Sequence, residues 1–178
     1  MTDAIDTIKS RHSTRYFDQG KEPSRADLEE VIRLAGLAPS WVDSQPWRVY
    51  LAMGETAKKI HARHLALAEA GTAASPDWET WHREAWDPYP RENMARHNQA
   101  SQEYLNTPEL LDLRTNILQK NLYYAPAIAY LTIPKQSNLW SVYDLGAFAQ
   151  TLALAAKAKG IDSMPAYELV KYPASVRE

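Results

Sequence analysis

The 178-residue sequence predicts an α+β fold in which helices flank a central sheet. Apolar side chains recur at helical spacing over residues 28–35, whereas they alternate with other side chains over residues 47–53. A nearly continuous apolar run at 127–133 is typical of a central strand. Helical segments separate the two expected strands, and the chain length favours a single domain over residues 1–178.

Two helices are expected before the first strand, and the first of them covers residues 3–9. Ser24 follows a proline and precedes Asp27 by three positions, which is typical of a helix start. Gly36 is typical of the end of that second helix. The second helix has one apolar face and is therefore expected to pack on the core.

A third helix is expected at residues 55–70, after Gly54 ends the first strand. His61 and His64 lie three residues apart, a spacing compatible with metal ligation. The sequence offers no recognisable third ligand, so no metal site is expected. The charged and polar side chains of this helix are expected to face solvent, namely Lys58, Lys59, Arg63 and His64.

Residues 71–90 have little helical or strand periodicity, and they carry large aromatic side chains at Trp78, Trp81, Trp86 and Tyr89. Two interpretations are open. The stretch forms a hydrophobic wrap on a partner subunit, which we favour slightly, or it forms a lid that lines a substrate site. A polar helix is expected after it, at residues 91–104.

Three further helices are expected in the second half of the chain. Thr107 and Pro108 form a helix start, and helical spacing of apolar residues continues from there to Leu122. Residues 139–159 form the longest regular pattern, with apolar side chains on most sides. We expect this helix to be buried near the core or a dimer axis. The last helix is expected to begin at Pro173.

Composition excludes several classes of function. The formal net charge is −2, from 20 basic and 22 acidic side chains without long blocks of one sign, so neither nucleic acid nor a membrane is an expected partner. The absence of cysteine excludes disulfides, thiolate metal ligands and a cysteine nucleophile. No signal-type or membrane-spanning apolar run occurs, and a soluble cytoplasmic protein is expected.

Residues Arg11 to Arg15 combine two guanidinium groups, an imidazole and hydroxyl groups within five positions. Guanidinium groups suit phosphate oxygens, and a bend rich in Ser and Thr can add backbone N–H donors. The alternative is a solvated basic link behind the first helix. These five residues taken alone favour that alternative.

A second polar stretch lies between the second helix and the first strand, where prolines bracket small polar side chains. Such a loop can present several hydrogen-bonding groups to a planar heterocycle while the flanking elements hold it still. An ordinary helix-to-strand connection beside buried tryptophan is the alternative. The residues concerned are Pro39, Ser40, Asp43, Ser44, Gln45 and Pro46.

Together the two stretches resemble the bacterial nitroreductase family of FMN-dependent NAD(P)H oxidoreductases. The resemblance rests on Arg-x-Ser-x-Arg at residues 11–15 and on Ala-Pro-Ser-x-x-Asp-x-Gln-Pro-Trp at residues 38–47. The family pattern has Asn where this sequence has Asp43. Asp144-Leu145-Gly146 and the sequence at 159–165 resemble later parts of the family pattern, so the resemblance extends over the whole chain.

The resemblance implies a mixed central sheet flanked by helices, and a homodimer with one FMN near each end of the interface. Arg11, His12 and Ser13 would bind the phosphate and ribityl end of FMN. Arg15 would lie at the pyrimidine edge of the flavin. The other cofactor-binding residues implied in this way are Pro39, Ser40, Asp43, Gln45, Gln119, Pro165, Ala166 and Tyr167.

The later part of the implied site departs from the family pattern. Residues 165–167 would lie against the N5 edge of the flavin, and Tyr167 stands where better-known members carry Glu. A family Asn before the Ala-Pro pair contacts the flavin; the register points here to Gln119, with Asn116 and Asn121 as competitors. We also expect the chain to be short at its C-terminus, without the last strand and basic pair of the family.

The implied activity is transfer of hydride from NADH or NADPH through flavin N5 to a small electron acceptor such as a nitroaromatic or a quinone. One site would serve donor and acceptor in turn, which is a ping-pong mechanism, and no side chain is expected to act as a nucleophile. Two alternatives stay open on the same fold. They are a non-catalytic flavin-binding dimer and a flavin-destructase or dehalogenase relative.

Overall fold

The computed structural model of the chain describes residues 3–177. These residues form two compact units, and each unit combines two separate segments of the sequence. The first unit takes in the described part of Met1–Lys59 together with Tyr124–Pro165. The second takes in Ile60–Tyr123 and the described part of Ala166–Glu178. The expectation of one domain over the whole sequence stays a prediction.

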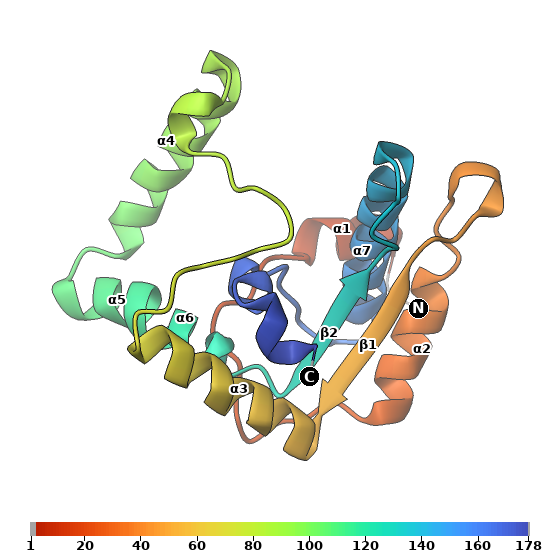
Figure 1. The fold of residues 1–178 in the computed structure, drawn as a ribbon, viewed down its shortest axis with the longest axis horizontal. Coiled ribbons are helices and arrows are strands. Elements are labelled where there is room, and N and C mark those ends of the chain that lie inside the picture. Colours follow the sequence, from red (N-terminus) through yellow and green to blue (C-terminus); the bar gives the residue numbers. More distant parts are fainter. Residues whose placement is uncertain (1–2, 178) are drawn as a thin grey trace. The chain divides into compact units, whose positions relative to one another are not determined.

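The first unit contains a sheet of two antiparallel strands, β1 (Arg48–Met53) and β2 (Ala127–Thr132), as Figure 1 shows. Both strands lie where the sequence predicts them, and the α+β class is confirmed. Among the described residues, the parallel pairing expected of a mixed sheet is limited to an isolated bridge between Ser13 and Ser163.

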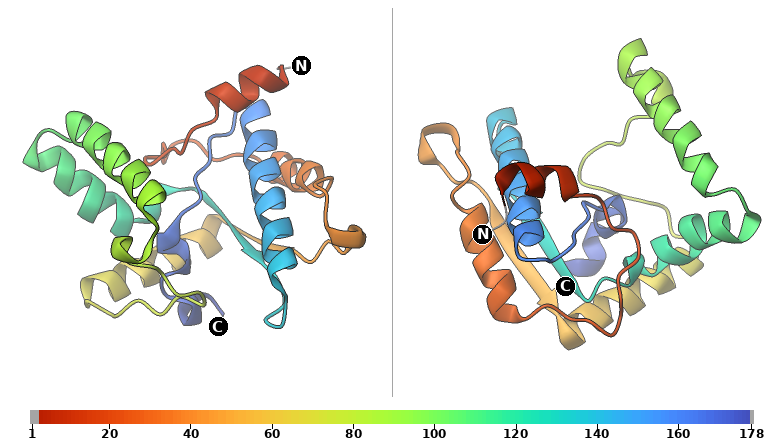
Figure 2. Two further views of the ribbon diagram at one scale, coloured as in Figure 1. Left: turned by 90° about the horizontal axis from the view of Figure 1, so that it is seen from above. Right: turned by 180° about the vertical axis from the view of Figure 1, so that it is seen from behind.

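Two helices of the first unit, α2 (Arg25–Ala35) and α7 (Leu139–Ala158), pack side by side next to this sheet (Figure 2). Val49 of β1 and Leu131 of β2 lie directly opposite each other and both pack on the same core. Small residues near the end of α2 let α7 approach closely, and aromatic rings fill the remaining space. The core consists of Ala35, Ala38 and Phe148, with Trp47, Val49, Leu131 and Leu152 packed against it.

Side-chain caps start the first two helices. The Asp3 carboxylate accepts a hydrogen bond from the N–H of Ile5 at the start of α1 (Ala4–Ser10). Ser24 accepts from the N–H of Asp27 at 3.1 Å and donates its hydroxyl to the Asp27 carboxylate at 2.6 Å. The predicted start of the second helix is therefore confirmed, because Ser24 satisfies an N–H that has no partner within the helix.

The described helices after β1 begin with α3 (Gly54–Glu69), which matches its prediction. A short 3-10 turn at Arg83–Ala85 interrupts the stretch expected to be irregular. Helix α4 (Pro88–Tyr104) begins three residues before the expected residue 91. Its early start is possible because prolines in the first turn remove N–H groups that have no helical partner.

The helix expected from Thr107 to Leu122 is interrupted. Helix α5 (Pro108–Asp112) starts as predicted with Thr107 as its cap, but a π-helical turn at Leu113–Ile117 follows, and then the short α6 (Leu118–Lys120). A run of left-handed backbone then ends the helix, at Leu122, Tyr123 and Tyr124 with φ of 46°, 60° and 58°.

Helix α7 has exposed side chains in its first turns and is mostly half-buried after Asp144, with Phe148, Ala153 and Ala156 buried. Leu139 and Tyr143 in its first turns are 85% and 71% exposed in the single chain, so the core does not bury this part, and its burial at a dimer axis stays a prediction. The loop around Trp41 contacts these turns, and the rings of Trp41 and Trp140 stack there at 5.3 Å. Neither α7 nor any other helix within residues 3–177 is long and apolar enough to cross a membrane.

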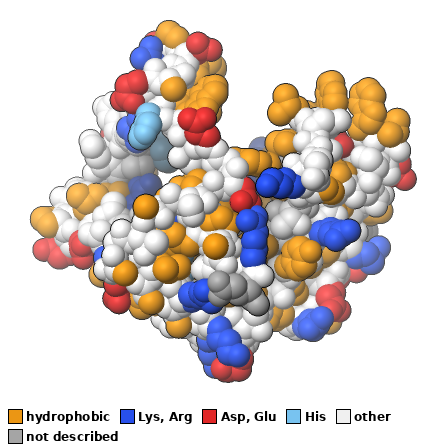
Figure 3. Space-filling view, viewed as in Figure 1, with side chains coloured by type: hydrophobic (Ala, Val, Ile, Leu, Met, Phe, Trp, Pro, Cys, Tyr) orange, Lys and Arg blue, Asp and Glu red, His pale blue; other side chains and the backbone are white. Residues whose placement is uncertain are grey.

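Figure 3 shows the exposed apolar side chains near the start of α7. We call this surface the apolar tip and define it by Trp41, Val42, Leu139, Trp140 and Tyr143.

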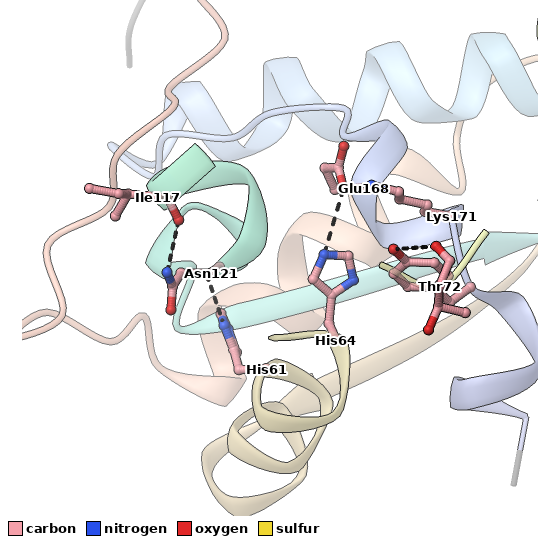
Figure 4. Close-up of polar contacts among 8 residues, drawn as sticks. His61, His64, Thr72, Ile117, Asn121, Glu168 and Lys171 are labelled. Atoms are coloured by element: carbon pink, nitrogen blue, oxygen red, sulfur yellow. Dashed lines mark hydrogen bonds and ion pairs between the residues drawn. The ribbon is translucent and has the colours of Figure 1, made fainter. Parts of the chain in front are cut away.

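The C-terminal segment of the second unit forms two 3-10 turns, Tyr167–Val170 and Pro173–Val176, so the helix expected at Pro173 is only a short turn. His64, which was expected to face solvent, is 5% exposed. It is buried because the C-terminal segment packs over α3: the rings of His64 and Tyr172 lie 5.3 Å apart, and Glu168 approaches the same imidazole (Figure 4).

Candidate functional site

The basic loop begins where α1 ends. The backbone N–H of Arg11 donates to the carbonyl oxygen of Thr7 at 3.0 Å and closes the last turn. Nδ1 of His12 lies 2.9 Å from the carbonyl oxygen of Ser10, so a hydrogen bond there requires the proton on that nitrogen. The two contacts fix the direction in which the chain leaves the helix.

A backbone bridge joins the basic loop to the segment after α7. Ser13 and Ser163 form a parallel bridge, in which the N–H of Thr14 donates to the carbonyl oxygen of Ser163 at 3.3 Å. The neighbouring Asp162 accepts from Nζ of Lys157 at 2.8 Å, and this hydrogen bond is the main cause that lowers the pKa of the Asp162 carboxyl. The bridge holds the basic loop beside the segment that leads to the implied N5-edge residues.

The guanidinium groups of the basic loop carry charge that no acidic side chain among residues 3–177 neutralises. Arg11 is partly buried and Arg15 is exposed, and neither guanidinium forms a hydrogen bond or an ion pair with another residue in the range 3–177. Guanidinium forks suit phosphate oxygens, and the hydroxyl of Ser13 lies between them in sequence. The chemistry of this donor set fits the phosphate of a mononucleotide such as FMN.

The loop between α2 and β1 has a strained backbone. Val42, Asp43 and Gln45 have φ of 47°, 57° and 40°, in the left-handed region. Valine is a marked outlier there because its branched Cβ crowds the backbone. Such conformations persist only where the surroundings fix them, and they cluster at ligand-binding sites.

Hydrogen bonds inside this loop hold part of its shape. The N–H of Gln45 donates to Oγ of Ser40 at 3.0 Å, and the N–H of Ser44 donates to the carbonyl oxygen of Trp41 at 2.9 Å. The side-chain amide of Gln45 donates to Oδ1 of Asp43 at 2.9 Å. Asp43, which replaces the family Asn, thus accepts a hydrogen bond within the loop. The second carboxylate oxygen of Asp43 and the side-chain oxygen of Gln45 can still accept from a ligand.

The later predicted residues divide between the two units. Pro165 belongs to the first unit, whereas Gln119, Ala166 and Tyr167 belong to the second. The cofactor-binding role of each residue named from the resemblance, including Pro39, stays a prediction.

Gln119 is favoured over its two competitors by their hydrogen bonds. The side-chain amide of Asn116 donates to Oδ1 of Asp112 at 2.6 Å, and that of Asn121 donates to the carbonyl oxygen of Ile117 at 2.8 Å (Figure 4). The side chain of Gln119 forms no such bond within the described part of the chain. Its amide is therefore available to a ligand.

Sequence reasoning missed the role of Asp144, which it noted only as part of a family pattern. The side chain is 4% exposed, and its Oδ2 accepts from the backbone N–H of Trp41 at 3.0 Å. A single carboxylate within the largely apolar helix α7 is the signal that could have pointed to it, because a buried polar group needs a partner.

The fold and the two loops define an α+β protein with a basic loop and a strained polar loop. The sequence profile described as the nitroreductase family matches residues 8–170. The chain therefore belongs to the nitroreductase family and is a nitroreductase-like enzyme.

Individual proteins agree with this assignment. Nitroreductase NfnB of Mycolicibacterium smegmatis is 31% identical over 183 residues, which cover 96% of this chain and 73% of that protein. A 4-nitrobenzoate reductase of Pseudomonas putida is 25% identical over 100% of this chain and 78% of its own length.

A solved structure has the same fold. The crystal structure of the FMN-dependent nitroreductase NfnB from Mycobacterium smegmatis in complex with NADPH superposes with a TM-score of 0.86 at 27% identity. The match covers 98% of this chain and 79% of that chain. The cofactor and the electron donor of that protein are of the kind that the sequence resemblance predicts.

Proposed function

We propose that this chain is an FMN-dependent oxidoreductase that passes hydride from NADH or NADPH to a small acceptor such as a nitroaromatic or a quinone. The observation that carries the proposal is the basic loop, whose two guanidinium groups have no acidic partner among residues 3–177. The likeness to a protein solved as FMN-dependent and with NADPH supports it.

The basic loop would bind and orient the cofactor. Arg11, His12 and Ser13 hold the phosphate and ribityl end in this proposal, and Arg15 lies at the pyrimidine edge. FMN, when bound, supplies a ring that takes up hydride at N5 and releases it again. A fixed positive charge from Arg15 favours negative charge on that ring and so raises its reduction potential.

The strained loop would recognise the flavin through acceptors. Asp43 already accepts from the amide of Gln45, so the second oxygen of Asp43 and the side-chain oxygen of Gln45 can accept from a ring N–H. Ser40 holds Gln45 in place through the loop backbone. Pro39 and Pro165 complete this set in the first unit. The family resemblance separately implies cofactor contacts from Gln119, Ala166 and Tyr167 of the second unit.

Donor and acceptor would use the site in turn. NAD(P)H gives up a hydride and leaves as NAD(P)⁺, and the acceptor then takes two electrons with protons from solvent. A quinone leaves as hydroquinone, and a nitro group leaves as nitroso with loss of water. The reaction needs no nucleophilic side chain, so the protein supplies binding, orientation and charge.

The proposed assembly is a homodimer. The apolar tip exposes Leu139 and Tyr143 at 85% and 71%, which supports its burial against a second copy of the chain. The cytoplasmic location and the absence of nucleic-acid or membrane partners stay predictions.

An anaerobic titration tests the proposed function. The purified protein is loaded with FMN, and its flavin absorbance is followed while NADH or NADPH is added. Bleaching by the donor, followed by recovery of the absorbance when a nitroaromatic or a quinone is added, is the expected result. Tight binding of FMN without bleaching would point to the non-catalytic binder, and no binding at all overturns the proposal.

A further inference from the structure

One face of α7 holds both ends of the strained loop. Trp140, Asp144 and Phe148 are spaced four residues apart, so their side chains line the same side of the helix. The ring of Trp140 stacks on Trp41 at 5.3 Å, and the ring of Phe148 stacks on Trp47 at 4.8 Å. Asp144 lies between these two stacks and accepts the N–H of Trp41 at 3.0 Å.

Asp144 makes the polar link between the loop and the rest of the first unit. Every other hydrogen bond described for residues 40–45 joins two residues of the loop itself. Within residues 3–177, the bond from Trp41 to Asp144 is the one that ties the loop backbone to a different element. Asp144 is 4% exposed, so bulk water does not compete with the Trp41 N–H for its carboxylate.

The loop needs such a link because its backbone is strained. Val42 is 83% exposed and has φ of 47° and ψ of 34°, so few packing contacts hold it in this conformation. Val42 directly follows Trp41, so the Trp41 N–H bonded to Asp144 is the nearest backbone group that is held in place. Loss of the anchor would let the loop relax toward ordinary backbone angles.

We propose that Asp144 is a positioning residue of the flavin site. It fixes the backbone of Trp41 and thereby holds Ser40, Asp43 and Gln45 in the arrangement that contacts FMN. The inference rests on the proposed function only in its assignment of the loop to FMN. The link between Asp144 and the loop stands on the geometry of the first unit.

Amide hydrogen exchange of the wild-type protein without FMN tests the link first. Trp41 is an exposed residue whose amide is bonded to a buried carboxylate, whereas the amide of Val42 takes part in none of the loop hydrogen bonds described above. We expect the Trp41 amide to exchange at least tenfold more slowly than that of Val42 after correction for intrinsic rates. Equal exchange of the two amides overturns the proposal.

Variants of Asp144 test its effect on the site. Asp144→Asn keeps a carbonyl oxygen for the Trp41 N–H, whereas Asp144→Ala removes the acceptor. We expect Asp144→Ala to speed amide exchange at Ser44 and Gln45 and to weaken FMN binding about tenfold. Asp144→Asn should keep exchange rates and FMN affinity close to those of wild type. Thr151→Ala is the matched control on α7, because its hydroxyl bonds to Ala147 within the helix.

The outcomes separate the two proposals. Wild-type affinity in Asp144→Ala, or a loss in Asp144→Asn as large as in Asp144→Ala, overturns the positioning role. If Asp144→Ala does not fold, the amide exchange of the wild-type protein and the FMN affinity of Asp144→Asn still test the positioning role. A wild-type protein that binds no FMN overturns the proposed function and the flavin part of this inference, whereas the exchange result on the protein without FMN still decides whether Asp144 holds the loop.

Discussion

His64 of α3 and Glu168 of the C-terminal segment lie 3.6 Å apart as a buried pair. Nζ of Lys171 also lies 3.3 Å from this carboxylate oxygen, and Arg63 and His61 are the basic neighbours of His64 on its own helix. Burial by itself raises the pKa of Glu168, but His64 and Lys171 outweigh it and hold the pKa below its ordinary value. The C-terminal segment is thus fastened to α3 by a charged carboxylate.

Stability of the protein should fall in acid because of this carboxylate. A lowered pKa means that Glu168 contributes stability in full above the unfolded value of about 4.3, and loses it as the pH falls through the folded value. Glu168→Gln should lower the free energy of unfolding by about 1.5–3 kcal/mol at neutral pH and make its decline in acid shallower. Urea unfolding across the acid range measures both, with the exposed Glu103→Gln as control. Parallel pH curves for wild type and Glu168→Gln would contradict the assignment.

Phe148 should dominate the core of the first unit. Its side chain is 1% exposed and stacks on Trp47 at 4.8 Å. Phe148→Ala leaves a cavity between α2 and α7 and should lower the free energy of unfolding by about 3–5 kcal/mol. Chemical denaturation measures the change. Gln150→Ala on the exposed side of α7 is the control and should stay within about 0.5 kcal/mol of wild type.

Arg11 should contribute to the affinity for FMN. If it binds the phosphate, Arg11→Ala removes a charge-assisted contact of about 1.5–3 kcal/mol and weakens binding by about one to two orders of magnitude. Fluorescence titration of FMN measures the change. Arg25→Ala, which removes an exposed arginine paired with Glu29, is the control. An unchanged affinity of the Arg11 variant removes this residue from the phosphate site.

Arg15 should affect the chemistry of the flavin more than its binding. Arg15→Gln removes the positive charge proposed for the pyrimidine edge, so the reduction potential of bound FMN should become more negative while FMN remains bound. An anaerobic redox titration compares wild type, Arg15→Gln and Arg15→Lys, and the lysine variant should keep most of the wild-type potential. Equal potentials in wild type and Arg15→Gln would place Arg15 elsewhere.

The apolar tip should be buried in a dimer. Leu139→Asp places a charge on a side chain that is 85% exposed in the single chain, so it should spare the fold of the monomer and weaken self-association. Sedimentation equilibrium at micromolar concentration measures the mass of each protein. Lys135→Asp in the exposed turn before α7 controls for the added charge. A wild-type protein that sediments as a folded monomer with FMN bound contradicts the dimer.

The sequence by itself determined the family, both strands and the starts of several helices. Ser24 and Thr107 start helices through bonds to N–H groups three residues ahead, so their patterns were readable without any tertiary contact. The two strands were also recognised from local patterns: apolar side chains alternate over residues 47–53 and form a nearly continuous run at 127–133. The motifs at residues 11–15 and 38–47 identified the family because their residue types and spacing are specific in combination.

Tertiary structure decided which polar residues are buried and which loops are joined. The helical pattern of α3 places His64 on the surface, but Glu168, which is distant in sequence, packs against it. Asp144 holds the loop only because Trp41, 103 positions away, packs on the same face of α7. Helical periodicity records which side chains share a face, but it carries no information about which distant segment packs there. That choice depends on the packing of the whole unit, which the local sequence does not encode.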